Sequence, residues 1–268
     1  MLDQKMIANI RDSGMVQGAA KVEKRARLLQ QELGFRVADK AEYALIASCF
    51  LPSVVPQGMN ALSNLLQHFE VDYTLLRKEY CCGELLFRQA LNDKSDEELT
   101  QAHVLAREFL DNNLRQVREL GASKIVTFCV GCDSVYARLK GVIPHEILWY
   151  PTLLAQLFRG GKLELQADYY AGCHYYSRRL SPTLPDLDSP LRILKQIEGL
   201  QLNHLNHELC CTRPRQAQSL AASIENKTVI TVCGGCAMSL QETLKNRGDC
   251  RVVMLPQVVW AAVSEHKL

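Results

Sequence analysis

The sequence predicts an α/β protein made of two similar halves, each a small parallel sheet flanked by helices, behind a helical N-terminal extension. Short apolar runs of strand length alternate with longer amphipathic segments, which indicates parallel strands joined by right-handed crossovers. The order of these segments occurs twice, and ten of the eleven cysteines repeat with it. We therefore expect an extension at 1–42, a first domain at 43–160 and a second domain at 161–268.

The N-terminal extension is polar and helix-prone. Within 19–33 the apolar side chains fall on one helical stripe, while the basic side chains lie elsewhere. Gly34 follows as a C-terminal cap. We expect a helix that covers an edge of the first domain; a docking element for a partner subunit is the alternative interpretation.

The first half contains strand-like runs, each followed by a helix-like segment. The long helix is the clearest, because Ser95 and Glu98 form a capping box at its start and Gly121 ends it. The expected strands are 43–48, 71–76, 124–128 and 145–149, and the expected helices are 58–70, 95–120, one from about Cys132, and 151–158.

The second half repeats this order after a joint near 159–162. The expected strands are 168–172, 227–232 and one opening at Cys250, and the expected helices are 190–199 and one from Cys236. The segment 250–260 also mirrors 145–154, with an apolar run followed by proline. An internal duplication of one βα unit explains this repetition.

The cysteines form two sets of five with the same order: a single cysteine, an adjacent pair, and a C-x-x-C motif. The first set is Cys49, Cys81, Cys82, Cys129 and Cys132, and the second is Cys173, Cys210, Cys211, Cys233 and Cys236. The single cysteines and the C-x-x-C motifs follow predicted strands, and parallel sheets bind ligands beyond the carboxyl ends of their strands. Each set can therefore converge at one edge of its sheet.

Five converging thiols indicate a metal centre. Thiolates are the ligands of iron–sulfur clusters, whereas a structural zinc ion needs only four ligands. Adjacent cysteines point in different directions, so each pair suits a centre with two nearby irons. Zinc in one half and two dithiol–disulfide relays remain alternatives, although a relay leaves the adjacent pairs unexplained.

These cysteines also resemble those of a known family. Cys81-Cys82-Gly83, with one cysteine upstream and a C-x-x-C downstream, is similar to the cysteine-rich CCG domain, which occurs in tandem in the B subunit of heterodisulfide reductase. The likeness runs from about Tyr43 to the end. The chain departs from the family pattern because Thr212 follows the second pair, and because 46 and then 21 residues separate the pair from C-x-x-C.

The resemblance implies that each set of five cysteines holds a [4Fe–4S] cluster, non-cubane as in heterodisulfide reductase. It further implies an oxidoreductase acting on sulfur groups, the catalytic B-type subunit of a larger complex. Electrons would pass between a ferredoxin-like [4Fe–4S] subunit and a disulfide, thiol or persulfide substrate. A flavin-containing subunit would belong to the same complex. The alternatives are a B-type subunit of a sulfur-oxidising complex, and a pure electron-transfer subunit of a flavin-dependent glycolate or lactate oxidation system.

Several residues near the cysteines could assist such chemistry. His174 follows Cys173 and is our candidate catalytic residue, a proton donor to a leaving thiolate, with a structural histidine as the alternative. Arginines that could offset cluster charge follow both pairs: Arg88, Arg213 and Arg215. We expect Arg178 and Arg179 on a solvated helix face, His204 and His207 in an exposed polar loop, and Cys250 as a buried small hydrophobe.

The composition disfavours several other classes of protein. The net charge of +2 is too small to imply a nucleic-acid partner. The first residues lack the pattern of a secretory signal, and no apolar run is long enough to span a membrane. No G-x-G-x-x-G motif follows a predicted strand, so the chain has no nucleotide fingerprint of its own. Clustered cysteines without a leader favour a reduced, cytoplasmic protein.

Overall fold

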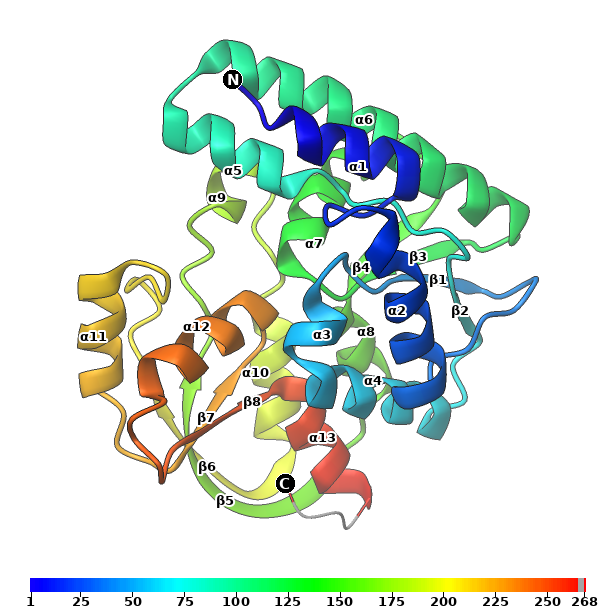
Figure 1. The fold of residues 1–268 in the computed structure, drawn as a ribbon. Coiled ribbons are helices and arrows are strands. Elements are labelled where there is room, and N and C mark those ends of the chain that lie inside the picture. The colour runs from blue at the N-terminus through cyan, green and yellow to red at the C-terminus, as the bar shows by residue number, and fades with distance from the viewer. Residues whose placement is uncertain (265–267) are drawn as a thin grey trace. The chain divides into compact units, whose positions relative to one another are not determined.

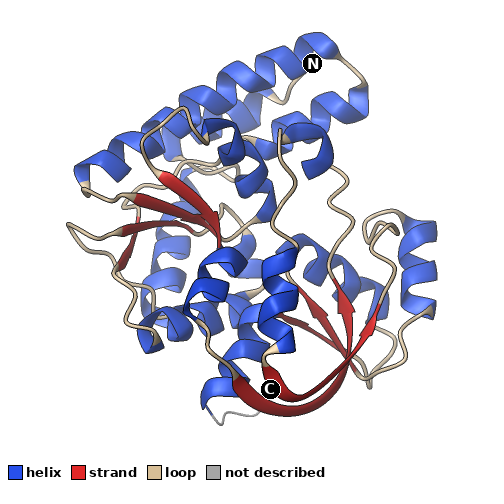
Figure 2. Ribbon diagram, turned by 180° about the vertical axis from the view of Figure 1, so that it is seen from behind, coloured by secondary structure: helices blue, strands red, loops and turns tan. Residues whose placement is uncertain are grey.

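The computed structural model describes residues 1–264 and 268, and these contain two four-stranded sheets (Figures 1 and 2). The strand order is β2-β1-β3-β4 in the first sheet and β6-β5-β7-β8 in the second. Every neighbouring pair of strands is parallel. The second order is the first with four added to each number, so the predicted α/β fold with a duplicated parallel sheet is confirmed.

The strands of the first sheet are short and almost wholly buried, as expected for parallel strands covered on both faces. Their bounds are β1 (Tyr43–Ile46), β2 (Tyr73–Leu75), β3 (Lys124–Thr127) and β4 (Glu146–Trp149). In the register, Tyr43 lies beside both Tyr73 and Lys124. Lys124 in turn lies beside Glu146, so all four strands begin at one level and their carboxyl ends lie at one edge.

The helices of the first half include the long helix that the capping box predicts. The Ser95 side chain accepts a hydrogen bond from the Glu98 backbone N–H, and the chain leaves the helix at Gly121 in a left-handed conformation. Helices α1, α5 and α6 lie side by side in Figure 1. The bounds are α1 (Gln4–Ser13), α3 (Leu51–Val54), α4 (Pro56–His68), α5 (Glu84–Asp93), α6 (Asp96–Glu119), α7 (Val130–Tyr136), η3 (Ala137–Leu139) and α8 (Tyr150–Leu157).

The second half has the longer strands, and β5 curves visibly in Figure 1. The strands are β5 (Gly161–Tyr170), β6 (Ile197–His204), β7 (Thr228–Thr231) and β8 (Arg251–Met254). The helices are α9 (Ser177–Leu180), α10 (Asp188–Lys195), α11 (Pro214–Ala222), α12 (Gly234–Leu244) and α13 (Leu255–Ser264). Helix α13 follows β8 just as α8 follows β4, which is the predicted mirror relation.

Three of the predicted elements need correction. The strand expected over 168–172 begins already at Gly161, within the expected joint, and ends at Tyr170. The helix expected over 190–199 ends at Lys195, and the chain continues as strand β6, so His204 lies at a strand end and not in a loop. The helix expected over 19–33 is three consecutive pieces: η1 (Ala19–Lys21), α2 (Val22–Arg27) and a π-helical turn, η2 (Leu28–Glu32). Helix propensity alone does not distinguish these forms.

The contacts divide the chain into two compact units, and each unit includes a segment from the other half of the sequence. Unit 1 comprises 1–53, 71–149 and 176–185, and unit 2 comprises 54–70, 150–175 and 186–268. The N-terminal stretch 1–42 is therefore part of unit 1. The boundaries expected at 42 and 160 describe the sequence repeat and stay predictions.

None of the helices within residues 1–264 is both long enough and apolar enough to cross a bilayer.

Candidate metal centres

The first thiol cluster, the set Cys49, Cys81, Cys82, Cys129 and Cys132, lies at the carboxyl edge of the first sheet. Cys49 follows the end of β1, and the adjacent pair lies between β2 and α5. Cys129 is the N-cap residue of α7, and Cys132 lies in the first turn of that helix. Three loops that follow neighbouring strands therefore supply all five thiols.

Contacts between sulfur atoms connect the whole first cluster. The Sγ atoms of Cys49 and Cys81 are 3.6 Å apart. Cys82 makes side-chain hydrogen bonds with Cys81 and Cys132, and Cys132 makes another with Cys129. The thiols other than Cys129 are buried. The sequence-predicted convergence of this set is therefore present in unit 1.

The second thiol cluster, the set Cys173, Cys210, Cys211, Cys233 and Cys236, repeats this arrangement in unit 2. Cys173 follows β5, the adjacent pair lies between β6 and α11, and Cys233 is the N-cap residue of α12. The Sγ atoms of Cys211 and Cys236 are 3.3 Å apart. Cys236 also contacts Cys233, and Cys173 contacts Cys210, through side-chain hydrogen bonds.

Close packing of the thiols changes their protonation. The hydrogen bond to Cys81, together with burial, raises the pKa of the Cys49 thiol well above its ordinary value. Hydrogen bonds with Cys132 and Cys81 lower the pKa of Cys82 to about 7. In the second cluster, burial raises the pKa of Cys173 to about 11, although the Tyr175 backbone N–H opposes it. Thiols this close cannot all ionise without a cation, because like charges in one buried site repel.

The N-terminal stretch holds the loops of the first cluster, which the sequence did not predict. The Cys81 backbone N–H donates to the Gly14 carbonyl at 2.8 Å. Arg25 donates from Nε to the Ser48 carbonyl at 3.0 Å and from Nη2 to the Glu79 carboxylate at 2.8 Å. Glu79 in turn accepts from the Ala47 backbone N–H at 2.9 Å. The only sequence signal for this network is an acidic residue two positions before the Cys81–Cys82 pair.

His174, the candidate catalytic residue, is buried beside the second cluster. Its Nε2 lies 2.8 Å from the Ala171 carbonyl oxygen, and its backbone has a φ of 49°. A Cβ built on Gly172 would meet both the His174 ring and the Cys236 sulfur. The imidazole is therefore close to a candidate ligand, and its role in proton transfer stays a prediction.

The arginines expected near the clusters divide into two groups. Arg88 lies over the Tyr176 ring, 4.6 Å from its centroid, and Arg213 lies over the Tyr175 ring at 4.3 Å. Each of these arginines lies in the segment that follows an adjacent cysteine pair, so the same kind of cation–π contact occurs in both halves. The remaining three are exposed, as predicted for two of them: Arg178, Arg179 and Arg215.

Outside the two sets, Cys250 is half-buried instead of fully buried, and it precedes β8. His204 and His207 are both exposed, as predicted.

The donor sets fit iron–sulfur clusters. Each offers five thiols with no disulfide among them. In residues 1–264 and 268, no three His, Cys, Asp or Glu side chains are arranged to hold a single metal ion. Five thiols per set exceed the four ligands of a structural zinc ion, and thiolates are the ligands of iron–sulfur clusters.

Fold and thiol clusters together define a cysteine-rich protein with two repeats. The sequence model of the cysteine-rich domain, CCG, matches residues 43–135 and 167–241, which is more than half of the chain. The chain belongs to the CCG cysteine-rich domain family.

Among its relatives is the D subunit of the dihydromethanophenazine:CoB–CoM heterodisulfide reductase of Methanosarcina acetivorans, 24% identical over 66% of this chain and 44% of that protein. Another is an uncharacterized iron–sulfur protein of Methanocaldococcus jannaschii, 24% identical over 88% of this chain and 49% of that protein. The chain thus spans about half the length of the curated relatives it matches. A solved structure, glutamate racemase RacE1 of Bacillus anthracis, aligns with 83% of this chain and 80% of that chain at 8% identity and a TM-score of 0.35, too low to establish a shared fold.

Proposed function

We propose that this chain is an iron–sulfur thiol/disulfide oxidoreductase, the CCG subunit of a larger complex. The observation that carries the proposal is the gathering of five thiols at the carboxyl edge of each of two sheets, in the same order. The names of the two relatives support it, since one is a heterodisulfide reductase subunit and the other an iron–sulfur protein.

The ten cysteines of the two thiol clusters would hold two [4Fe–4S] clusters, which we propose to be non-cubane. When bound, such clusters supply one-electron transfer and an iron that can bind a sulfur ligand. The overall reaction adds two electrons and two protons to a disulfide, breaks its S–S bond and releases two thiols. A ferredoxin-like subunit would supply the electrons and exchange them with a flavin-containing subunit, in the cytoplasm.

Residues of the chain itself would position the loops that carry the thiols and protonate the leaving thiolate. Arg25 and Glu79 fix the loop that presents Cys49, because their pair is nearly buried, with side chains 14% and 3% exposed. His174 would hold a proton close to Cys236 and release it to a leaving thiolate. Its contact with the Ala171 carbonyl fixes the ring, so that its orientation is already set before substrate binds.

Iron and acid-labile sulfide analysis of anaerobically purified protein tests the cofactor. We expect about eight irons per chain, since two four-iron clusters are proposed. Cys82→Ala and Cys211→Ala should each remove about half of the iron. Cys250→Ala, which lies outside both sets, is the matched control and should retain all of it. A wild-type value near four irons would restrict the cluster to one half.

Electron paramagnetic resonance then tests the reaction. Adding a thiol to the oxidised protein should change the cluster signal if an iron is open to substrate. An unchanged signal would instead favour an electron-transfer subunit of a flavin-dependent 2-hydroxy-acid oxidation system. Product analysis with a disulfide and with a persulfide distinguishes reduction from a sulfur-oxidising role.

A further inference from the structure

The hydroxyl of Tyr136 is buried beside the first thiol cluster. Tyr136 has no exposed surface and lies one helical turn after Cys132 on α7, so the two side chains lie on the same face of that helix. It packs in the same buried core as Cys82 and Cys132. Burial, and after it the charge of Cys132, raises the pKa of Tyr136 well above its ordinary value. The phenol therefore stays protonated and has a hydrogen to donate.

A series of hydrogen bonds fixes the direction in which this hydroxyl donates. Asn113 of α6 accepts from the Tyr80 backbone N–H through Oδ1 at 2.7 Å, so the other end of its side chain is the amide nitrogen. That nitrogen, Nδ2, donates to the Tyr80 carbonyl at 2.7 Å and to the Tyr136 oxygen at 3.0 Å. The Tyr136 oxygen is thus an acceptor toward Asn113, and its own hydrogen points elsewhere.

The Tyr136 hydrogen has no acceptor in the part of the chain that the structure describes. Buried polar groups are almost always paired, because an unpaired donor loses its contact with water and gains nothing in return. Among the groups whose charge affects Tyr136 are two thiols, Cys132 and Cys82. These become thiolates when they bind iron, and thiolate and sulfide sulfurs of iron–sulfur clusters accept hydrogen bonds.

The second half lacks this free phenol hydrogen. Leu240, four residues after Cys236, stands at the position equivalent to Tyr136 and is just as buried. A buried tyrosine, Tyr170, does pack against the second thiol cluster, but its hydroxyl donates to the Leu209 carbonyl at 2.6 Å. An unpaired phenol donor is therefore a feature of the first half.

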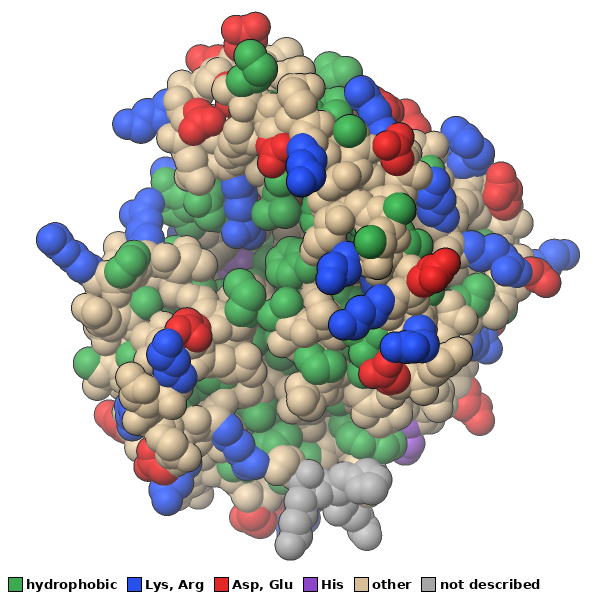
Figure 3. Space-filling view, viewed as in Figure 1, with side chains coloured by type: hydrophobic (Ala, Val, Ile, Leu, Met, Phe, Trp, Pro, Cys, Tyr) green, Lys and Arg blue, Asp and Glu red, His purple; other side chains and the backbone are tan. Residues whose placement is uncertain are grey.

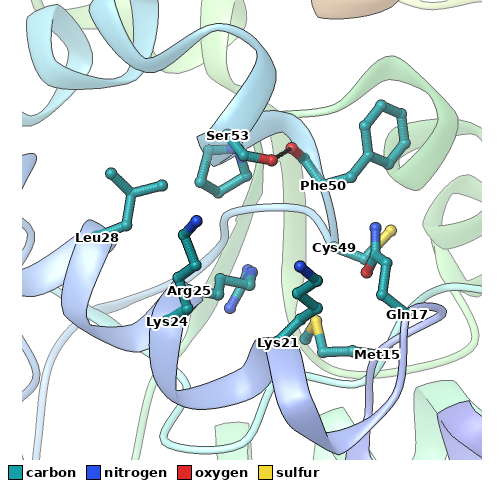
Figure 4. Close-up of a pocket in the computed structure, with 10 residues that line it drawn as sticks. Met15, Gln17, Lys21, Lys24, Arg25, Leu28, Cys49, Phe50 and Ser53 are labelled. Carbon is teal, nitrogen blue, oxygen red and sulfur yellow. Dashed lines mark hydrogen bonds between the residues drawn. The ribbon is translucent and has the colours of Figure 1, made fainter.

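The surroundings of Tyr136 are drier than those of Cys49. A pocket of about 170 Å³ opens beside Cys49, and its lining includes neither Cys82 nor Cys132 (Figure 4). The two lysines of this lining, Lys21 and Lys24, are exposed, and Figure 3 shows Lys and Arg side chains gathered over α2. Water and salt screen such exposed charges, whereas a hydrogen bond in a buried core keeps its strength.

We propose that Tyr136 donates a hydrogen bond to a thiolate or sulfide sulfur of the iron–sulfur cluster held by the first thiol cluster, and thereby raises the reduction potential of that iron–sulfur cluster. The proposal rests on the proposed function and names a residue that sets the electron affinity of its first centre. Reduction takes one electron from a one-electron donor and adds one negative charge. Hydrogen bonds to the sulfurs stabilise this charge and so favour the reduced state. The proton stays on Tyr136.

A redox titration of the anaerobically purified full chain tests the proposal, with dithionite as the reductant and electron paramagnetic resonance as the readout. Cys211→Ala as a background variant removes the second signal and so assigns the first. At a fixed potential, Tyr136→Phe should lower the ratio of reduced to oxidised first iron–sulfur cluster at least threefold, about 28 mV for a one-electron couple. The shift should persist at about 1 M salt, where the Debye length is about 3 Å.

Tyr73→Phe is the matched control, because it removes another buried hydroxyl of unit 1. Tyr73 is the first residue of β2, at the amino end of the sheet, and its hydroxyl accepts from the Arg36 backbone N–H at 3.4 Å. The same ratio should change less than threefold in this variant. A change below threefold in Tyr136→Phe, an equal change in Tyr73→Phe, or a shift that disappears at high salt would overturn the proposal.

Iron content of each variant identifies any loss of the iron–sulfur cluster itself. If Tyr136→Phe loses iron, 3-fluorotyrosine at position 136 decides the question: its more acidic phenol is a stronger donor and should raise the ratio above wild type. An unchanged or lower ratio overturns the proposal. If the first thiol cluster of wild type binds no iron, the proposed function and this inference both fail. If the ratio shifts as expected but no disulfide is reduced, only the proposed reaction fails.

Discussion

Ser48 and Gly172 occupy the same place in the two halves, one residue before the first cysteine of each set. Both have left-handed backbones, with φ of 81° and 97°. Glycine adopts this conformation without cost, whereas another residue pays about 1–3 kcal/mol and keeps it only when its surroundings impose it. For Ser48 those surroundings include Arg25, which binds the Ser48 carbonyl. In each half the left-handed residue turns the chain from the strand toward the first cysteine of the set, so the backbone geometry before Cys49 and Cys173 shapes the thiol cluster.

Gly14 gives the first test at this scale. Its φ is 81°, and a Cβ placed there would overlap the Glu79 carbonyl oxygen, next to the point where Gly14 accepts from Cys81. Gly14→Ala should lower the free energy of unfolding by more than about 2 kcal/mol, because steric overlap adds to the cost of the left-handed backbone. Chemical denaturation of the protein measures it.

Gly141 is the matched control. Its φ of 76° is nearly the same, but nothing lies within 4 Å of a built Cβ. Gly141→Ala should therefore lower the free energy of unfolding only by the cost of the left-handed backbone, about 1 kcal/mol. Equal losses in the two variants would mean that the contact between Gly14 and Glu79 is not restrictive.

The Arg25–Glu79 pair gives the second test. Removing one partner leaves a nearly buried charge without compensation, so Arg25→Gln and Glu79→Gln should each cost about 3–5 kcal/mol. The double variant should lose much less than the sum. In both single variants, mild chelation should also remove iron from the first thiol cluster before the second, as measured by iron analysis.

Arg107→Gln provides the comparison for that pair. Arg107 and Asp111 are about half exposed, and such surface pairs contribute at most about 1 kcal/mol. If the Arg25 variants change stability and iron content no more than Arg107→Gln does, the pair has no positioning role.

At the scale of elements, the strands that end just before the C-x-x-C motifs could be predicted from the sequence, but the edge strand β6 could not. Strands β3 and β7 are rich in buried β-branched residues and end just before C-x-x-C, so composition and motif agree. Strand β6 has exposed and half-buried side chains and contains Gly199 at a φ of 85°, which weakens its strand pattern. Its strand character comes instead from pairing with β5, a long-range contact that local sequence does not encode.

The same distinction holds for the two thiol clusters. Spacing in the sequence identified their ten cysteines, because the order of five recurs. The contact from Arg25 to Glu79 spans 54 positions along the chain and has no repeat in the second half, so no pattern could predict it.

Asp186, which lies two residues before helix α10, provides a pH-dependent prediction. Burial would raise the pKa of Asp186, but hydrogen bonds from Ser189 and Thr152 outweigh it and hold the pKa below its ordinary value. A depressed carboxyl pKa stabilises the fold above the unfolded value of 3.8, and this contribution is lost as pH falls through the folded pKa. Asp186→Asn should thus lower Tm near neutral pH, and the difference from wild type should shrink between about pH 5 and 3.

Thermal unfolding of both proteins across this range measures the effect. Asp188→Asn, which changes the exposed first residue of α10, is the control and should leave the pH profile of Tm unchanged. A Tm difference between wild type and Asp186→Asn that is constant over the whole range would contradict the assignment.

At the scale of the whole molecule, the sequence repeat and the compact units do not coincide. Helix α4 comes from the first half but belongs to unit 2, where it packs on α13. A Cβ on Gly58 of α4 would lie only 2.9 Å from the sulfur of Met254, the last residue of β8, so α4 also packs closely against the end of that strand. Tyr176–Pro185 comes from the second half and belongs to unit 1. The duplication visible in the sequence is therefore not a division into two separately built halves.

Because each compact unit includes a segment from the other half of the sequence, fragments cut at the repeat boundary should be less stable than fragments that keep a whole unit. A fragment of residues 161–268 lacks α4, so buried apolar side chains of α13, which packs on α4 in the full chain, would lose part of their cover. Exposing several such side chains costs about 1.5–3 kcal/mol each, comparable with the whole stability of a small domain. We expect no cooperative unfolding transition from this fragment alone by circular dichroism. A second fragment, 54–70 joined by a flexible linker to 150–268, contains every segment of unit 2, together with 176–185 of unit 1, and should regain the transition. Cooperative unfolding of 161–268 by itself would instead support the boundary expected from the sequence, with α4 dispensable.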